Sequence, residues 1–166
     1  FPQVLKGEGV AHKTEAGAVR LNLSSVGESV EAAKGMATQG YLIEEMITGG
    51  VVELLIGVVC DPAHGYVLTL AAGGTLTEIW QDSASLLIPA SDASVEAALR
   101  SLRIAPLLDG HRGAAPADMP SILRAVRAVQ DYVLAHGDGL AEIEINPLIC
   151  TAQDAIAADA LLRRTD

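Results

Sequence analysis

The spacing of hydrophobic residues changes near residue 90, and this change constrains the fold more than any other feature of the sequence. Before it, apart from a helix candidate at 29–37, apolar and polar residues alternate or form short β-branched runs, which is the pattern of strands. After Ser91, the residues Val95, Leu99 and Leu102 recur at helical spacing, and a second helical pattern extends to about residue 135. Alternation returns after Gly137. Because strands and helices mix without a βαβ rhythm, we expect an α+β fold with a mainly antiparallel sheet flanked by helices.

The individual elements follow from the same patterns and from Gly and Pro positions. A strong turn at Asp61-Pro62-Ala63-His64-Gly65 predicts an antiparallel hairpin between its flanking strands. The expected strands are 4–5, 18–23, 41–47, 51–59, 66–71, 77–80, 85–88, 141–146 and 155–160, and the expected helices are 29–37, a segment starting at 91–92, and 120–135. No repeat, low-complexity segment or linker is recognisable, so residues 1–166 are expected to form one domain.

The charge balance limits the partners of the chain. It carries 11 Lys and Arg against 21 Asp and Glu, a net charge of −10 that disfavours nucleic acid and anionic membrane surfaces. No apolar run approaches the roughly 18 residues that a membrane span needs. Cys60 and Cys150 lie far apart in apolar runs and are expected to be buried free thiols in a reducing cytoplasm.

The most informative segment runs from Glu142 to Leu148. Alternate residues of a strand share a face, so Glu142, Glu144 and Asn146 are expected on one face and the intervening isoleucines in the core. Carboxylate and carboxamide oxygens two residues apart, beside Pro147, suit Mg²⁺, and Asp159 on the following strand would complete the site. On spacing alone, an ordinary solvated strand face explains the same residues.

Two positive or nucleophilic candidates lie near the N-terminus. Lys6 ends a strand before a glycine-containing loop, where a lysine can reach a phosphate, although a surface lysine is the commoner outcome. His12 lies in the segment His12-Lys13-Thr14 between glycines, where it can act as a proton carrier or phosphoryl acceptor beside a cation. A lone histidine in a loop is more often simply solvated.

A nucleoside site is suggested by acidic residues at strand ends. Glu44-Glu45-Met46 ends one strand, and Glu53 interrupts the apolar run of the next, where a carboxylate needs a partner, a ligand or an outward position. Gly73-Gly74, with Glu78 after it, forms a flexible backbone corner that can approach an anion closely.

Taken in order, these segments resemble one family, the ATP-grasp domain of the NDP-forming (ADP-forming) acyl-CoA and acetyl-CoA synthetases. This domain corresponds to the β-subunit side of those enzymes and is related to the succinyl-CoA synthetase β subunit. The resemblance covers nearly the whole chain through Val4-Leu5-Lys6, residues 11–19 around His12, Glu44-Glu45-Met46, residues 52–57, residues 61–65, Gly73-Gly74 to Glu78, residues 110–113 with Asp118, and Glu144-Ile145-Asn146-Pro147-Leu148 with Asp159-Ala160.

The resemblance implies an ATP-grasp fold that lacks its N-terminal part here, since the chain begins inside a strand-like segment without Met. It implies an acid-thiol ligase that converts acid, CoA and ATP into acyl-CoA, ADP and phosphate through a phosphohistidine, with ATP or ADP and Mg²⁺ as cofactors. The implied residues are, by role, His12 and Glu78 in the active site, Lys6 on the nucleotide phosphates, Glu44, Glu45 and Met46 along the adenine, Glu53 on the ribose, and Asn146, Asp159 and Glu144 on Mg²⁺.

The implied partners are CoA-binding and ligase domains, in the same polypeptide or in an α subunit, within an oligomeric cytoplasmic enzyme. The chain alone is expected to be inactive. Two alternatives remain open at this point: a non-catalytic regulatory or interaction module with the same fold, and a succinyl- or malate-CoA ligase β-type subunit. His12 favours the acyl-CoA synthetase over the succinyl type, and its presence together with Glu53, Asn146 and Asp159 favours a catalytic domain over a decayed one.

Overall fold

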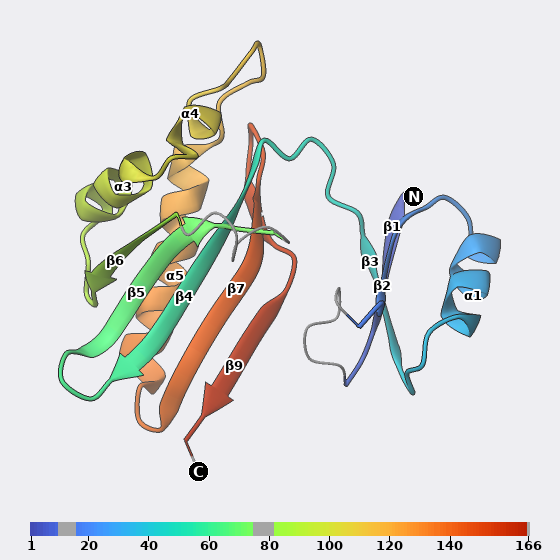
Figure 1. Ribbon diagram of the computed structural model, residues 1–166, viewed down its shortest axis with the longest axis horizontal. Coiled ribbons are helices and arrows are strands. Elements are labelled where there is room, and N and C mark those ends of the chain that lie inside the picture. Colours follow the sequence, from blue (N-terminus) through green and yellow to red (C-terminus); the bar gives the residue numbers. More distant parts are fainter. Residues whose placement is uncertain (10–15, 75–81, 166) are drawn as a thin grey trace. The chain divides into compact units, whose positions relative to one another are not determined.

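The computed structural model describes residues 1–9, 16–74 and 82–165 (Figure 1). It divides into two compact units, Phe1–Thr48 and Gly49–Asp166. The sequence, which contains no recognisable linker, does not predict this division. The boundary falls directly before the Gly49-Gly50 pair.

In the first unit, residues 1–9 and 16–48 form a three-stranded antiparallel sheet with one helix. The strand order is β2-β1-β3, and the elements are β1 (Gln3–Gly7), β2 (Val19–Leu23), α1 (Val26–Lys34) and β3 (Tyr41–Glu45). Leu5, Leu23 and Met36 form its buried core. The helix begins three residues before the predicted position because Ser25 Oγ accepts a hydrogen bond from Glu28 N at 3.2 Å and so caps it.

The described residues of the second unit form a six-stranded antiparallel sheet and three helices. The strand order is β6-β5-β4-β7-β8, and β9 also pairs with β7. The elements are β4 (Val52–Asp61), β5 (Gly65–Ala72), β6 (Ser83–Leu87), α3 (Asp92–Ser101), α4 (Ala105–Leu108), α5 (Met119–His136), β7 (Leu140–Cys150), β8 (Ala155–Ala157) and β9 (Ala160–Arg164). The predicted hairpin is confirmed, since Asp61 pairs with Gly65 across its turn.

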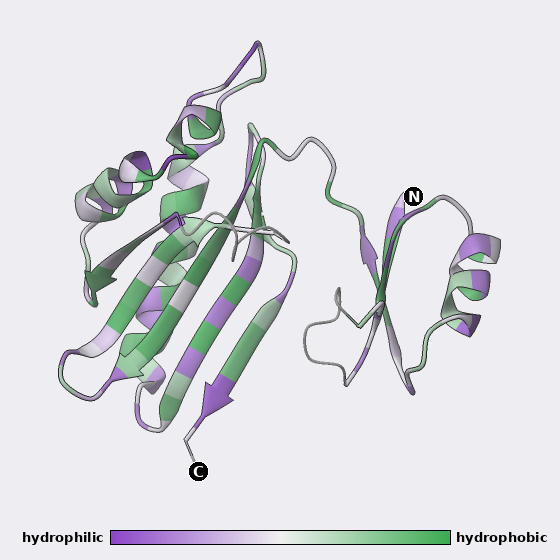
Figure 2. Ribbon diagram, in the orientation of Figure 1, coloured by the Kyte–Doolittle hydropathy of each residue, from purple (hydrophilic) through white to green (hydrophobic). Residues whose placement is uncertain are grey.

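The core of this unit lies between one face of the sheet and the helices. Alternate residues of β4 are buried, and hydrophobic and hydrophilic residues alternate visibly along β7 (Figure 2). The apolar side of α5 packs into the same core through Ile122, Val126, Val129 and Val133. The prediction of an α+β fold with mainly antiparallel pairing is therefore confirmed.

Several local predictions need correction or remain outside the description. Cys150 is buried as expected, but Cys60 is exposed because it lies near the solvent end of the β4–β5 hairpin. β7 does not end at Asn146 but continues through Pro147 to Cys150. The strand expected at 77–80 lies outside the described residues. Among the described helices, none is both long and apolar enough to cross a membrane.

Candidate functional site

Asn146 and Asp159 lie side by side where the pairing of the sheet is irregular. The register of β4 against β7 shifts here, so that Leu54 pairs with Leu148 but Ile56 pairs with Ile145, and β7 carries an extra residue. On its other side β7 pairs with β8 and then β9, and the break between those two strands contains Asp159. Asn146 N donates to Asp159 O at 3.2 Å across this gap. Bulges of this kind re-aim side chains and are frequent beside active sites.

The Gly73-Gly74 turn is hydrogen-bonded to both Asn146 and Glu53 at the same end of the sheet. The Gly74 N–H donates to Asn146 Oδ1 at 3.0 Å, and the preceding Gly73 N–H donates to Glu53 O at 2.8 Å. Glu53 is exposed, on the side of β4 opposite the buried Val52 and Leu54. Its position in the apolar run is thus explained by an outward orientation, which leaves its carboxylate available to a ligand.

The two acidic residues of β7 that precede Asn146 are Glu142 and Glu144. Glu142 forms an ion pair with Arg163 of β9 at 3.2 Å, in keeping with an ordinary strand face. Glu144 pairs in register with Gly57 and Leu161, and it lies two residues before Asn146. Ile143 is buried, as the alternation predicts.

Among the described residues at this end of the sheet, Asn146 and Asp159 offer oxygen donors to a metal ion. Within the ranges 1–9, 16–74 and 82–165, no three His, Cys, Asp or Glu side chains gather closely enough to hold a metal ion. Asn146 and Asp159 therefore suit an ion that takes few protein ligands and completes its shell with phosphate and water. Mg²⁺ in nucleotide sites is bound in this way.

The first unit brings together two of its predicted site residues. The Lys6 side chain is nearly buried and forms an ion pair with the Glu44 carboxylate, from the neighbouring strand β3. Glu45 is exposed at the end of β3. The Met46 N–H donates to Pro2 O at 3.1 Å, so this amide is already engaged by the protein. The predicted active-site residues His12 and Glu78 lie outside the described residues.

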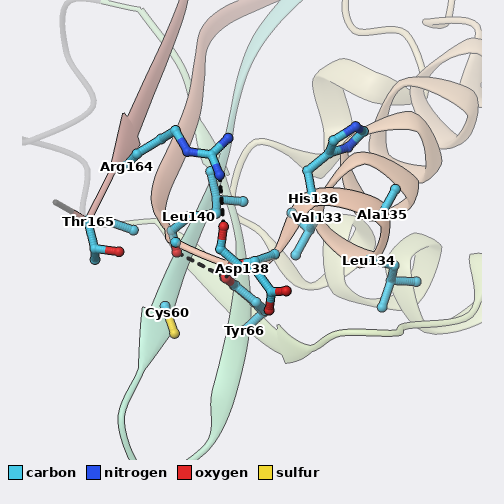
Figure 3. Close-up of a pocket in the computed structure, with 13 residues that line it drawn as sticks. Cys60, Tyr66, Val133, Leu134, Ala135, His136, Asp138, Leu140, Arg164 and Thr165 are labelled. Carbon is cyan, nitrogen blue, oxygen red and sulfur yellow. Dashed lines mark hydrogen bonds between the residues drawn. The ribbon is translucent and has the colours of Figure 1, made fainter.

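A separate pocket lies at the other end of β7, where α5 turns into that strand (Figure 3). The Tyr66 hydroxyl contacts the carbonyl oxygens of Gly137 and Leu140, and Arg164 Nη2 donates to Asp138 O at 2.8 Å. Burial raises the pKa of Tyr66, with a smaller contribution from Cys60 beside it. These hydrogen bonds all hold the α5–β7 turn against the sheet. The residues that line this pocket are therefore explained by a structural role.

The sequence predicts candidate metal and ribose residues in the second unit, and a flexible backbone corner at Gly73-Gly74 that can approach an anion closely. It does not predict the hydrogen bond from Gly74 to Asn146. A signal was present in the sequence, because two adjacent glycines at the end of a buried strand indicate close backbone contacts.

Comparison with known proteins shows the family of the chain. A family model described as an ATP-grasp domain matches residues 1–163. The sequence is 35% identical over 178 residues to trans-feruloyl-CoA synthase FCS1 from an unknown prokaryotic organism, covering 98% of this chain and 25% of that protein. It is 27% identical over 173 residues to the ADP-forming acetate–CoA ligase I subunit beta of Pyrococcus furiosus, covering 96% of this chain and 74% of that subunit.

Solved structures show the same fold. The dinucleotide-forming acetyl-coenzyme A synthetase 1 of Ca. Korarchaeum cryptofilum, in complex with coenzyme A, Ca-AMPCP and HgCl⁺, is similar with a TM-score of 0.85 and 29% identity, covering 99% of this chain and 76% of that one. A structure of that synthetase with coenzyme A and Mg-AMPPCP gives a TM-score of 0.84, again with 29% identity and the same coverage of both chains.

The chain spans about a quarter of the length of the feruloyl-CoA synthase. The family match, in contrast, extends over almost all of its own residues, and the fold agrees with it. The chain therefore belongs to the ATP-grasp domain family.

Proposed function

We propose that residues 1–166 are the nucleotide-binding ATP-grasp portion of a larger ADP-forming acyl-CoA synthetase. The enzyme would convert acid, CoA and ATP into acyl-CoA, ADP and phosphate. The observation that carries the proposal is the convergence of Glu53, Gly74, Asn146 and Asp159 at one end of the second unit's sheet. The similarity to ADP-forming CoA ligases supports the same activity.

The metal part of the proposal rests on Asn146 and Asp159, with Glu144 as a third candidate. The Asn146 carboxamide oxygen already accepts the Gly74 N–H, so the amide is oriented with its oxygen rather than its nitrogen toward that side. An amide oxygen has two lone pairs, and one is left for an ion. When bound there with the nucleotide, Mg²⁺ would offset phosphate charge that a chain of net charge −10 otherwise repels.

The nucleoside part assigns the ribose hydroxyls to the Glu53 carboxylate, which is exposed and makes an acceptor for hydroxyl donors. The adenine would lie along Glu44, Glu45 and Met46. Because the Met46 N–H is bonded to Pro2 O, the base edge would form hydrogen bonds with backbone carbonyls rather than with this amide.

The phosphate contacts would come from Lys6. Its ammonium is paired with Glu44 in the structure, and a nucleotide phosphate would compete with that carboxylate. The exchange replaces one charge-assisted contact by another, so the nearly buried ammonium remains compensated.

Phosphoryl transfer is assigned to His12 on the strength of the family resemblance, with Glu78 lining the active site. In the direction of acyl-CoA synthesis, a ring nitrogen of His12 forms a bond to the γ-phosphorus as the bond to the ADP oxygen breaks. The phosphoryl group is then passed to a second histidine in the CoA-binding part of the enzyme. That part would belong to the same polypeptide or to an α subunit, in an oligomeric cytoplasmic enzyme.

The proposal is tested by incubating the whole enzyme that contains residues 1–166 with Mg²⁺ and ATP labelled with ³²P at the γ-position. We expect acid-labile, base-stable label on the wild type and none on His12→Asn. His111→Asn, which changes an exposed loop histidine, serves as the control and should keep the label. Absence of label from the wild type, or its persistence in His12→Asn, would contradict the assignment.

A further inference from the structure

The Gly73-Gly74 turn passes unusually close to the backbone of β4. A Cβ atom at Gly73 would lie 2.5 Å from the carbonyl carbon and oxygen of Leu54, a distance that real Cβ atoms do not tolerate. The Gly73 N–H uses this proximity to donate to Glu53 O at 2.8 Å. The turn is therefore fixed against the strand that carries the Glu53 carboxylate.

Gly74 makes two further contacts that point to the two halves of the proposed nucleotide site. Its N–H donates to Asn146 Oδ1 at 3.0 Å. A Cβ built on it would lie 2.3 Å from Glu53 Oε2, so the carboxylate occupies the space that a side chain would need. Its φ of +82° is also a conformation that glycine adopts without strain. Gly74 thus donates a hydrogen bond to the proposed metal ligand and, because it has no side chain, leaves the space that the proposed ribose carboxylate occupies.

We propose that Gly74 is a positioning residue that holds the Glu53 carboxylate and the Asn146 amide oxygen in one fixed arrangement, so that Mg²⁺ and the nucleoside bind cooperatively. This inference rests on the nucleotide site proposed above. Asn146 Oδ1 would hold the metal ion, and the ordering of its amide would extend through the Gly74 N–H to the turn beside Glu53. A ribose bound to Glu53 would restrict the same turn from the other side. Binding of either ligand would therefore lower the conformational-entropy cost of binding the other.

A merely structural turn would need glycine only for its backbone conformation. Gly65 provides the matched comparison, because its φ of +77° is similar and no atom lies within 4 Å of a Cβ built on it. Gly65→Ala therefore measures the strain of a positive φ alone. Gly74→Ala adds to that strain the displacement of the Glu53 carboxylate, whose Oε2 lies where the new Cβ would be.

The experiment measures the affinity of ADP by calorimetry with Mg²⁺ and with EDTA, and the ratio of the two dissociation constants for each protein. We expect Gly74→Ala to reduce this ratio by at least about tenfold, and Gly65→Ala to leave it within about twofold of the wild type. Circular dichroism checks that both variants fold. In a Glu53→Ala background, where this carboxylate is absent, adding Gly74→Ala should change ADP binding much less than it does in the wild type.

The outcomes separate this inference from the proposed function. If Asn146→Ala abolishes the effect of Mg²⁺ while Gly74→Ala behaves like Gly65→Ala, the site stands and the role of Gly74 is wrong. An equal effect of Gly74→Ala in both Glu53 backgrounds would also contradict it. If the wild type binds no ADP, the proposed function and the inference fail together.

Discussion

Asn146 and Asp159 meet where two irregularities of the sheet coincide, the bulge in β7 and the break between β8 and β9. The Asn146 N–H bonds to Asp159 O at 3.2 Å, and Ala158 N bonds to Pro147 O at 3.0 Å. The backbone thus stays hydrogen-bonded through the irregular segment. A regular strand would have alternated side chains through this point, whereas the bulge frees Asn146 from that constraint.

Glu53→Gln should weaken ADP binding by about tenfold, since a neutral amide replaces a charged acceptor for ribose hydroxyls and such a bond contributes ~1.5 kcal/mol or more. Calorimetric titration with ADP and Mg²⁺ measures this change. Glu142→Gln is the matched control, because Glu142 is also an acidic residue of this sheet but is paired with Arg163. Equal loss in both variants would show that the effect is general electrostatics and not a ribose contact.

Asp82→Ala should lower the free energy of unfolding by about 1–3 kcal/mol. The Asp82 carboxylate is buried and accepts the backbone N–H groups of Arg103 at 2.9 Å and Ile104 at 3.1 Å. Its removal leaves two amides near the end of α3 without these acceptors. Urea denaturation measures the loss, and Asp131→Ala on the exposed side of α5 should stay within about 0.5 kcal/mol of the wild type. A similar small effect for Asp82→Ala would contradict the anchoring role.

Tyr66→Phe should lower stability by about 1 kcal/mol at neutral pH, because the hydroxyl that joins β5 to the Gly137 and Leu140 carbonyls is lost. The pKa of Tyr66 is raised above 10.0, first by burial. The stabilisation is therefore complete below the unfolded pKa of about 10 and disappears as the pH rises through the folded value. Denaturant unfolding from pH 8 to 11.5 should show that the difference in free energy of unfolding between the wild type and Tyr66→Phe becomes smaller. A difference that stays constant over this range would contradict the stabilising role of the Tyr66 hydroxyl.

The two cysteines should differ sharply in reactivity. Cys60 is exposed, whereas Cys150 is buried, and burial raises the pKa of the Cys150 thiol to about 12. An alkylating reagent at pH 8 should modify Cys60 in the native protein and both thiols only after unfolding, as mass spectrometry would record. Cys60→Ser should abolish native labelling, and Cys150→Ser should leave it unchanged. Rapid native labelling of Cys150 would show that its core position is wrong.

The sequence predicted most of the second unit because its signals are local. Alternation placed Ile143 in the core, and the turn at Asp61 to Gly65 identified the hairpin correctly. The helix expected at 120–135 is present as α5; Asp118 directly precedes it, and its carboxylate accepts from the Ser121 hydroxyl and not from the helix backbone. These features depend on residues close together in the chain.

The sequence does not predict features that depend on contacts between residues far apart in the chain. The bulge at Asn146 arises from its pairing with β4, and the contacts of Gly74 depend on residues 21 positions before it and 72 positions after it. The pairing of Lys6 with Glu44 likewise requires the register of β1 against β3. The division at Thr48 reflects the distribution of contacts and not composition. Periodicity within one segment contains none of this information.

The most direct test of the proposed nucleotide site is the Mg²⁺ dependence of ADP binding to wild type and Asn146→Ala, measured by isothermal titration calorimetry. We predict that Mg²⁺ tightens ADP binding to the wild type by at least about tenfold, and that Asn146→Ala loses this gain while still binding ADP weakly in EDTA. If Mg²⁺ tightens ADP binding equally in both proteins, Asn146 is not a metal ligand and the account of this site is wrong.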